Sequence, residues 1–135
     1  MRDMPMATIE EQFRRMTFNI VARNQDDHVK NIAFLIDKAG NWFLSPAFDM
    51  TYSYNPTGDW TSRYRMSLNG KRDDFTIDDF KACAKNIAMK RGRAEEIVYQ
   101  VQAAVLHWSQ LADQSGVATS IADGIARTHR SGILK

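Results

Sequence analysis

Apolar residues in the first part of the chain recur at helical spacing. Successive members are separated by four, three and four positions, and they are Ile9, Phe13, Met16 and Ile20. This spacing places all of them on one face of a helix. Thr8 followed three positions later by Glu11 is typical of an N-terminal capping box. The pattern therefore predicts a helix over residues 9–22, and the polar string that follows predicts a loop.

A shorter period follows in residues 32–44. Ile32, Phe34 and Ile36 alternate with Ala33 and Leu35, as expected for a short strand. The string KAGN at 38–41 predicts a turn, and WFL at 42–44 predicts a second strand. Because a hairpin folds back on itself, it would bring the loop at 26–31 close to the loop that ends at Asp49.

Residues 51–75 read as a long polar connection with Asn-Pro, Thr-Gly and Asn-Gly turn signals. Aromatic side chains are spaced along this connection before Phe75 at its end, at Tyr52, Tyr54, Trp60 and Tyr64. Aromatic side chains in such a segment more often anchor it to the body of the domain than contact a ligand. We therefore expect these four residues to be anchors.

The remainder of the chain predicts three further helices. Thr76 and Asp79 form a capping-box pattern that starts a helix ending near Gly92. A third helix is predicted over 94–114, where six apolar positions form a core stripe: Ile97, Val101, Ala104, Val105, Trp108 and Leu111. A fourth helix is predicted over 120–129. The expected fold class is mainly α with one small β-hairpin.

Composition narrows the function classes. The 135 residues fit one domain over 1–135, and the single cysteine, Cys83, excludes an internal disulfide. A net charge of +2 from 18 basic and 16 acidic residues gives no direct signal for nucleic-acid binding. No apolar run is long enough to cross a membrane, and the first residues do not form a signal peptide. These absences make a cytoplasmic location the expectation.

The string DDHVKN at 26–31 carries the candidate chemistry. Asn31 follows Asp26 by five positions, and a lone carboxylate, Asp49, follows the hairpin. Protein kinases show the same spacing, with a catalytic-loop Asp, an Asn five positions later and a further Asp beyond a hairpin. Mg²⁺ prefers oxygen ligands, so an Asn amide oxygen and an Asp carboxylate suit it.

Plainer interpretations exist for each of these residues. An Asp-Asp-His string after a helix is often a solvated loop, and Asp49 after Pro46 fits a turn. His28 alone is more often structural than catalytic. A three-histidine metal site is not favoured, because the two other histidines, His107 and His129, lie far along the chain.

Three strings together resemble a known family. FNIVARNQDDHVKNIAFL, WFLSPAFDM and MSLNGKRDDF are similar to the C-terminal domain of HipA-type kinases, over about residues 11–93. These are bacterial serine/threonine protein kinases that act as toxins of toxin–antitoxin pairs. The combination of N-x-D-x-H-x-K-N with S-P-A-F-D is far more specific than the Asp–Asn spacing alone. The resemblance implies a protein-kinase-like C-lobe.

The resemblance also implies roles for individual residues. Asp26 matches the catalytic Asp that orients or deprotonates the substrate hydroxyl, and only the register with Asn31 separates it from Asp27. Asn31 and Asp49 match the Mg²⁺ ligands. His28 and Lys30 would lie beside the phosphates of ATP. A literal D-F-G is absent, because Met50 and Thr51 follow Asp49.

A kinase also needs an upper lobe that covers the ATP phosphates. The predicted first helix begins within about ten residues of Met1, and no G-x-G-x-x-G string is present, so we expect this chain to contain the lower lobe alone. We therefore expect little kinase activity from it in isolation. The upper lobe would come from the parent protein or from a partner chain.

The resemblance implies further partners and leaves two alternatives open. It implies a protein substrate, which is an aminoacyl-tRNA synthetase in the best-known members, and a helix-turn-helix antitoxin. Phosphatidylinositol kinases use a similar D-x-H-x-x-N loop, so a lipid substrate is the first alternative. The second alternative is a non-catalytic interaction module, which an exposed apolar face would support.

Overall fold

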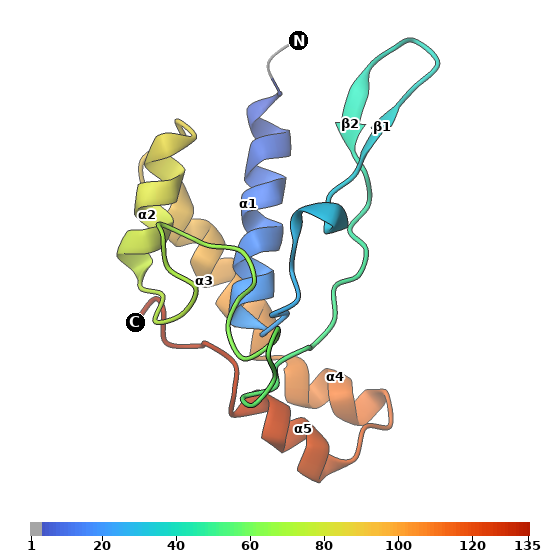
Figure 1. Cartoon of the computed structure of the whole chain (residues 1–135), viewed down its shortest axis with the longest axis vertical. Helices are drawn as coiled ribbons and strands as arrows, with labels where there is room; N and C mark the ends of the chain where they lie inside the picture. The colour runs from blue at the N-terminus through green and yellow to red at the C-terminus, as the bar shows by residue number, and fades with distance from the viewer. Residues whose placement is uncertain (1–3) are drawn as a thin grey trace.

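Helices dominate the computed structural model, which describes residues 4–135 (Figure 1). The elements are α1 (Met6–Val21), the single 3₁₀ turn η1 (Val29–Asn31), β1 (Phe34–Ile36), β2 (Trp42–Leu44), α2 (Ile77–Asn86), α3 (Arg93–Val105), α4 (Trp108–Gln114) and α5 (Thr119–Ala126). The predicted class, mainly α with one β-hairpin, is confirmed.

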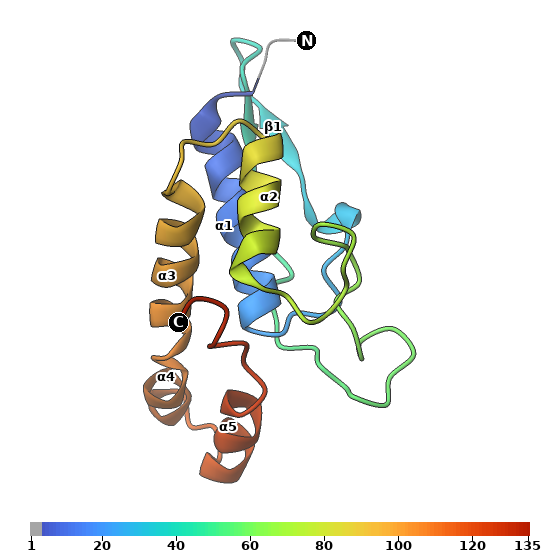
Figure 2. The ribbon, with the colours of Figure 1, turned by 90° about the vertical axis from the view of Figure 1, so that its left-hand side faces the viewer.

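The core lies between α1, α2 and α3, which run side by side in both views (Figures 1 and 2). Phe13 of α1 meets Phe80 of α2 edge to face, with ring centroids 6.3 Å apart. The long connection adds Tyr64, Leu68 and Phe75 to the same cluster. The long connection is therefore packed onto the helices, and this packing fixes its position next to the candidate site.

The hairpin forms as predicted. Strands β1 and β2 pair antiparallel with Phe34 opposite Leu44 and Ile36 opposite Trp42. The turn is closed by Asp37, whose carboxylate accepts hydrogen bonds from the backbone N–H groups of Ala39 and Asn41. Both faces of the hairpin carry exposed apolar side chains. The hairpin stands apart from the three helices (Figure 1).

The start of α1 differs from the prediction. The helix begins at Met6 with Pro5 at the N-cap, so the predicted capping box of Thr8 and Glu11 is wrong. The backbone N–H of Thr8 already donates to the Pro5 carbonyl oxygen at 2.9 Å. Thr8 therefore lies within the first turn, where its hydroxyl is not placed to cap the helix.

The capping box at α2 is confirmed. Asp79 at the third helical position accepts from the backbone N–H of Thr76 at 2.8 Å. Asp79 also accepts from Asn69 at 2.9 Å and Lys71 at 3.0 Å, which ties the connection to the helix. Burial acts to raise the pKa of Asp79, but these hydrogen bonds outweigh it and lower the pKa to about 2. The helix ends at Asn86, earlier than predicted.

Asp79→Ala should lower the free energy of unfolding by about 2 kcal/mol, because it removes the cap and leaves four donor groups without their acceptor. The matched control is Asp78→Ala, since the neighbouring Asp78 side chain is 84% exposed and should change stability by less than about 0.5 kcal/mol. Urea titration of both variants measures the difference. Equal losses would show that the Asp79 contacts contribute nothing beyond a surface charge.

The predicted helix over 94–114 is broken into α3 and α4, so that prediction is wrong in its continuity. At the break the His107 N–H donates to the Ala104 carbonyl three residues back, which tightens the turn. The Trp108 indole N–H then donates to the Ala122 carbonyl at 2.9 Å, so α4 packs on α5. Leu111, predicted in the core stripe, is exposed.

The last helix and the connection also differ in part from the predictions. Helix α5 spans Thr119–Ala126, ending before the predicted His129, and the Arg130 N–H then donates to the Val21 carbonyl at 2.9 Å. Tyr64 is buried as an anchor, but Trp60 is 69% exposed, so its predicted anchoring role is wrong. Among residues 4–135, no helix combines the length and apolarity needed to cross a bilayer.

Candidate functional site

The loop after α1 turns sharply and then places several polar side chains in the interior. Arg23 adopts a positive φ of 62°, which reverses the chain directly after the helix. Asn24, Gln25 and Asp27 are buried although all three are polar. Buried polar side chains must find hydrogen-bond partners, so this loop is held by specific contacts.

Asn24 connects the two loops of the candidate site. Its side-chain N–H donates to the Asn19 side chain at 3.1 Å and to the Asp49 carbonyl oxygen at 3.2 Å. Its side-chain oxygen accepts from the Ser53 hydroxyl at 3.1 Å. The Ser53 oxygen in turn accepts from the Asp26 backbone N–H. One buried amide therefore fixes the backbone at Asp26 and at Asp49 relative to each other.

The adjacent carboxylates Asp26 and Asp27 have different surroundings. The Asp26 side chain is 44% exposed and pairs with Arg65 at 3.0 Å. Asp27 is 5% exposed and accepts a short hydrogen bond from the Tyr64 hydroxyl. Burial, followed by the nearby Asp27 charge, raises the pKa of Tyr64 above its ordinary value, which keeps the phenol protonated as a donor. Asp26 is therefore accessible to a substrate, whereas Asp27 is enclosed.

The hairpin returns the chain to the site. Ser45 continues the strand ladder by donating its N–H to the Ala33 carbonyl at 2.9 Å. Arg15 of α1 donates to the Ser45 carbonyl oxygen at 2.9 Å, which holds the start of the string SPAFD against the helix. Asp49 then adopts a positive φ of 54°, a conformation that Asp tolerates better than most residues.

Asn31 and Asp49 line one small cavity, together with Asp27. The cavity has a volume of about 10 Å³, which is close to the space of one water molecule. Helix α1 contributes the polar side chains of Gln12, Arg15 and Asn19 to its wall. Asp26, His28 and Lys30 do not line it. The hairpin has thus brought two of the predicted residues together, with an unpredicted helix face opposite them.

The carboxylate and amide side chains of the cavity fit a small hard cation. Gln12 lines the cavity and its side-chain oxygen is buried without a hydrogen-bond partner. Amide and carboxylate oxygens are the ligands that Mg²⁺ prefers. Within residues 4–135 no group of three or more His, Cys, Asp or Glu side chains could hold a metal. A cation here would therefore depend on amide oxygens as well as carboxylates, as the predicted Asn31–Asp49 pair requires.

His28 and Lys30 belong to the same loop and lie in different environments. The His28 Nδ1 atom is buried and has no hydrogen-bond partner. Lys30 lies in η1 and is exposed. Neither residue has a contact that assigns it to a phosphate, so their roles beside ATP remain predictions.

Four residues that support the site were missed by the sequence reasoning, and they are Gln12, Asn24, Tyr64 and Arg65. Gln12 belongs to the polar side of α1, which the core pattern does not distinguish from a solvated face. Tyr64 and Arg65 come from the long connection, nearly forty positions after the loop they contact. Only Asn24 carried a signal, because it opens the string N-x-D-x-H-x-K-N.

Comparison with known proteins gives one match. A family model described as the HipA-like C-terminal domain matches residues 1–108. No curated protein and no solved structure matches the chain. The matched range includes the loop at 26–31, the hairpin, Asp49, and helices α1 to α3. The chain therefore belongs to the family of HipA-like C-terminal domains.

Proposed function

We propose that this domain is the lower lobe of an ATP- and Mg²⁺-dependent serine/threonine protein kinase, the toxin of a toxin–antitoxin pair. Family membership supports the proposal, and one observation carries it. Asn31 and Asp49, eighteen positions apart in the chain, line the same cavity, where the Gln12 side-chain oxygen has no partner. A cavity whose lining includes carboxylate and amide side chains offers the oxygen ligands that a kinase needs for its metal ion.

The position and exposure of each site residue indicate the role that we assign to it. Asn31 and Asp49 would hold Mg²⁺, and the bound Mg²⁺–ATP supplies the phosphoryl group that is transferred. Asp26 is exposed and can accept a hydrogen bond or a proton from a substrate hydroxyl. Asp27 is enclosed by its contact with Tyr64 and supports the loop. His28 and Lys30 belong to this loop and would face the phosphates.

An upper lobe is required to cover the nucleotide, and the hairpin offers a surface for it. Phe34, Ile36, Trp42 and Phe43 are all exposed apolar residues of the two strands. Exposed apolar clusters of this kind mark interaction sites. We infer that the upper lobe, from the parent protein or a partner chain, covers the hairpin. The substrate would be a protein such as an aminoacyl-tRNA synthetase, and a helix-turn-helix antitoxin would be the inhibitory partner.

The same exposed hairpin favours a second candidate function, a non-catalytic interaction module. Such a module would use Trp42 and its neighbours to bind a partner and would have no use for the cavity. The two functions differ in what they require of Asn31 and Asp49. A module leaves these residues free to vary, whereas a kinase lobe needs both.

Titration calorimetry of this chain with ATP tests the proposal. In the presence of Mg²⁺ we expect binding that disappears when EDTA removes the metal. The double variant Asn31→Ala plus Asp49→Ala should bind about tenfold more weakly or not at all, because it removes both oxygen ligands. If the double variant binds Mg²⁺–ATP as tightly as the unchanged chain, the metal assignment is wrong.

A matched control separates lost ligands from lost charge. Asn86→Ala plus Asp113→Ala removes the same residue types at exposed positions of α2 and α4, outside the cavity. This control should bind as the unchanged chain does. If the unchanged chain itself shows no Mg²⁺-dependent binding, the interaction module is favoured unless addition of the upper lobe restores binding.

A further inference from the structure

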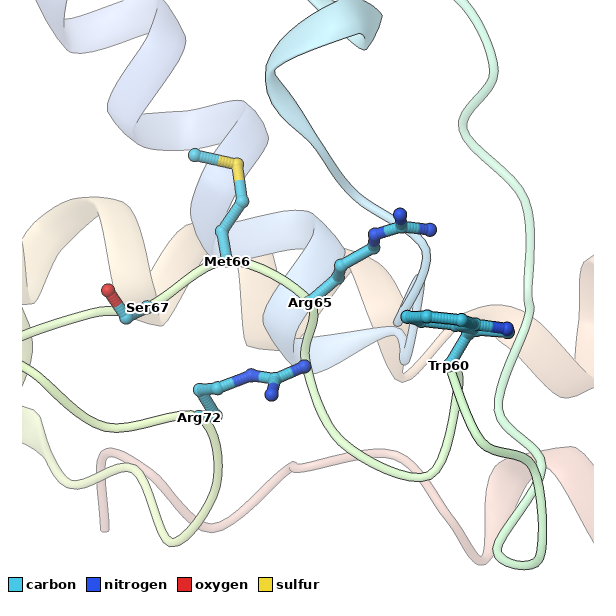
Figure 3. Close-up of a pocket in the computed structure, with 5 residues that line it drawn as sticks. All are labelled: Trp60, Arg65, Met66, Ser67 and Arg72. Atoms are coloured by element: carbon cyan, nitrogen blue, oxygen red, sulfur yellow. The ribbon is translucent and has the colours of Figure 1, made fainter.

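A groove of about 550 Å³ lies on the surface of the long connection (Figure 3). Its lining comes entirely from residues 60–72 and consists of Trp60, Arg65, Met66, Ser67 and Arg72. We call this feature the arginine groove. The cavity with Asn31 and Asp49 shares none of these lining residues, so the groove is a separate site.

Hydrogen bonds within residues 64–72 hold the walls of the arginine groove in place. The Tyr64 N–H donates to the Arg72 carbonyl at 3.1 Å, and the Arg72 Nε–H donates back to the Tyr64 carbonyl at 2.8 Å. Leu68 and Lys71 exchange two further backbone hydrogen bonds. The Tyr64 and Leu68 side chains are buried in the core. The segment is therefore a hydrogen-bonded loop whose Tyr64 and Leu68 side chains anchor it in the core, which favours a preformed site.

The lining is cationic and partly aromatic. It includes two guanidinium groups and no carboxylate. The Arg65 guanidinium lies 5.3 Å from the centre of the Trp60 ring, and the ring is 69% exposed. Figure 3 shows Trp60 beside Arg65 and the Arg72 side chain extending toward the chain segment that carries Arg65. Arginine guanidinium groups bind carboxylates in a directional, charge-assisted way.

The groove adjoins the carboxylate that we assign to catalysis. Arg65 lines the groove and also pairs with Asp26 at 3.0 Å. The Arg65 backbone N–H donates to the Gln25 carbonyl at 3.0 Å, which fixes the edge of the groove to the loop beside Asp26. The groove is therefore close enough to Asp26 to contact a residue a few positions from a hydroxyl bound there.

We propose that the arginine groove binds an acidic residue of the protein substrate, close in sequence to the Ser or Thr that is phosphorylated. The proposal rests on the proposed kinase function. Arg72 and Arg65 would donate hydrogen bonds to the carboxylate, and Trp60 would pack against a neighbouring substrate side chain. A peptide is favoured over a nucleic acid, because nucleic-acid binding draws on many phosphate contacts and the net charge here is only +2.

Nuclear magnetic resonance titration of the ¹⁵N-labelled chain tests this site without ATP. The probe is a seven-residue peptide with a central serine flanked by glutamates, and the comparison peptide replaces each glutamate by lysine. We expect the glutamate peptide to shift the amide signals of residues 60–72 and the lysine peptide to leave them unchanged. Equal shifts with both peptides, or none with either, would overturn the proposal. A short single-stranded oligonucleotide that binds more tightly than the glutamate peptide would also overturn it.

Variants locate the binding groups. Arg72→Gln should weaken binding of the glutamate peptide about tenfold, because a charge-assisted hydrogen bond is lost. Arg63→Gln is the matched control, since Arg63 is exposed in the same segment and does not line the groove. Trp60→Gln serves as a second variant should Arg72→Gln disturb the fold, because the exposed Trp60 ring can be replaced with little structural cost. Affinities unchanged in both groove variants would refute the site.

Failure of this proposal and failure of the kinase proposal have different signatures. Peptide binding is measured without nucleotide, so it can fail while Mg²⁺–ATP binding at Asn31 and Asp49 succeeds. If the peptide binds and Mg²⁺–ATP does not, the groove is a peptide site on a domain that does not bind ATP.

Discussion

In the proposed kinase, with its upper lobe present, Asp26→Asn should slow phosphoryl transfer by about 10²- to 10⁴-fold, the usual contribution of a general base. The substitution keeps the shape of the side chain and its capacity to accept a hydrogen bond from Arg65. It removes the negative charge that attracts the substrate hydroxyl proton. Folding should change little, because the Asp26 side chain is nearly half exposed.

The adjacent carboxylate supplies the matched comparison. Asp27→Asn makes the same chemical change one position along, but at a buried residue that accepts the Tyr64 hydroxyl. Asp27 also lines the cavity with Asn31 and Asp49. We therefore expect Asp27→Asn to lower stability and metal binding, whereas Asp26→Asn leaves both close to their original values.

Three measurements on each variant distinguish the roles of the two carboxylates. The rate of transfer from radiolabelled ATP to a protein substrate reports on catalysis, calorimetry reports on Mg²⁺–ATP binding, and urea titration reports on stability. Full activity in Asp26→Asn would exclude it as the catalytic residue. If Asp27→Asn then lost activity while its stability and nucleotide binding were unchanged, the catalytic role would pass to Asp27.

The spacing of the sequence motifs could predict which loops would meet. It could not predict which of two neighbouring side chains would be buried and which exposed. Asn31 and Asp49 follow from the Asp–Asn spacing and from the alternating residues of the hairpin, which are both local patterns. Asp26 and Asp27 are identical in type and adjacent in the chain. What separates them is contact with Tyr64 and Arg65, which lie nearly forty positions away. No local pattern contains that information.

The same limit explains the differences in the helices. The apolar stripe over 94–114 correctly placed Ile97, Val101 and Val105 in the core. It could not show the break after Val105, because the break depends on α4 turning to pack on α5. The Thr8–Glu11 pattern matched a capping box, yet the helix begins at Met6 with Pro5 at the N-cap. Periodicity identifies faces, whereas tertiary contacts decide where an element begins and ends.

The hairpin shows how far a correct local prediction can fall short of function. Its alternation is real and its register is regular. A half-buried strand would hide one set of side chains, but both faces of this hairpin are exposed and apolar. That exposure is a property of the arrangement in space. It gives the site a surface for the proposed upper lobe, next to the loops that carry Asn31 and Asp49.

The Tyr64 hydroxyl should contribute strongly to stability, because it is the donor to a buried carboxylate. Tyr64 is 1% exposed, and its ring also meets Phe75 edge to face at 5.9 Å between centroids. Tyr64→Phe keeps that ring packing and removes only the hydroxyl. Leaving the Asp27 carboxylate without this donor should lower the free energy of unfolding by about 3 kcal/mol at pH 7.

The pH dependence of this difference tests its origin. Burial, followed by the Asp27 charge, raises the pKa of Tyr64 above the ordinary value of 10.0. A raised pKa in the folded state means that the stabilisation is fully present below pH 10 and is lost as the pH rises toward the folded value. The stability difference between the unchanged chain and Tyr64→Phe should therefore shrink above pH 10, by up to about 1.4 kcal/mol per pH unit.

Urea titrations from pH 8 to pH 11 measure this difference, and lysine titration cancels because it is common to both proteins. Tyr99→Phe is the control, since Tyr99 is exposed on α3 and loss of its hydroxyl should change stability little. A Tyr64→Phe difference that stays constant to pH 11 would mean that the protonated phenol is not what stabilises the loop. A difference that shrinks as expected would show that the Tyr64–Asp27 hydrogen bond stabilises the long connection. Because Asp27 also lines the cavity with Asn31 and Asp49, the same bond would then support the candidate site.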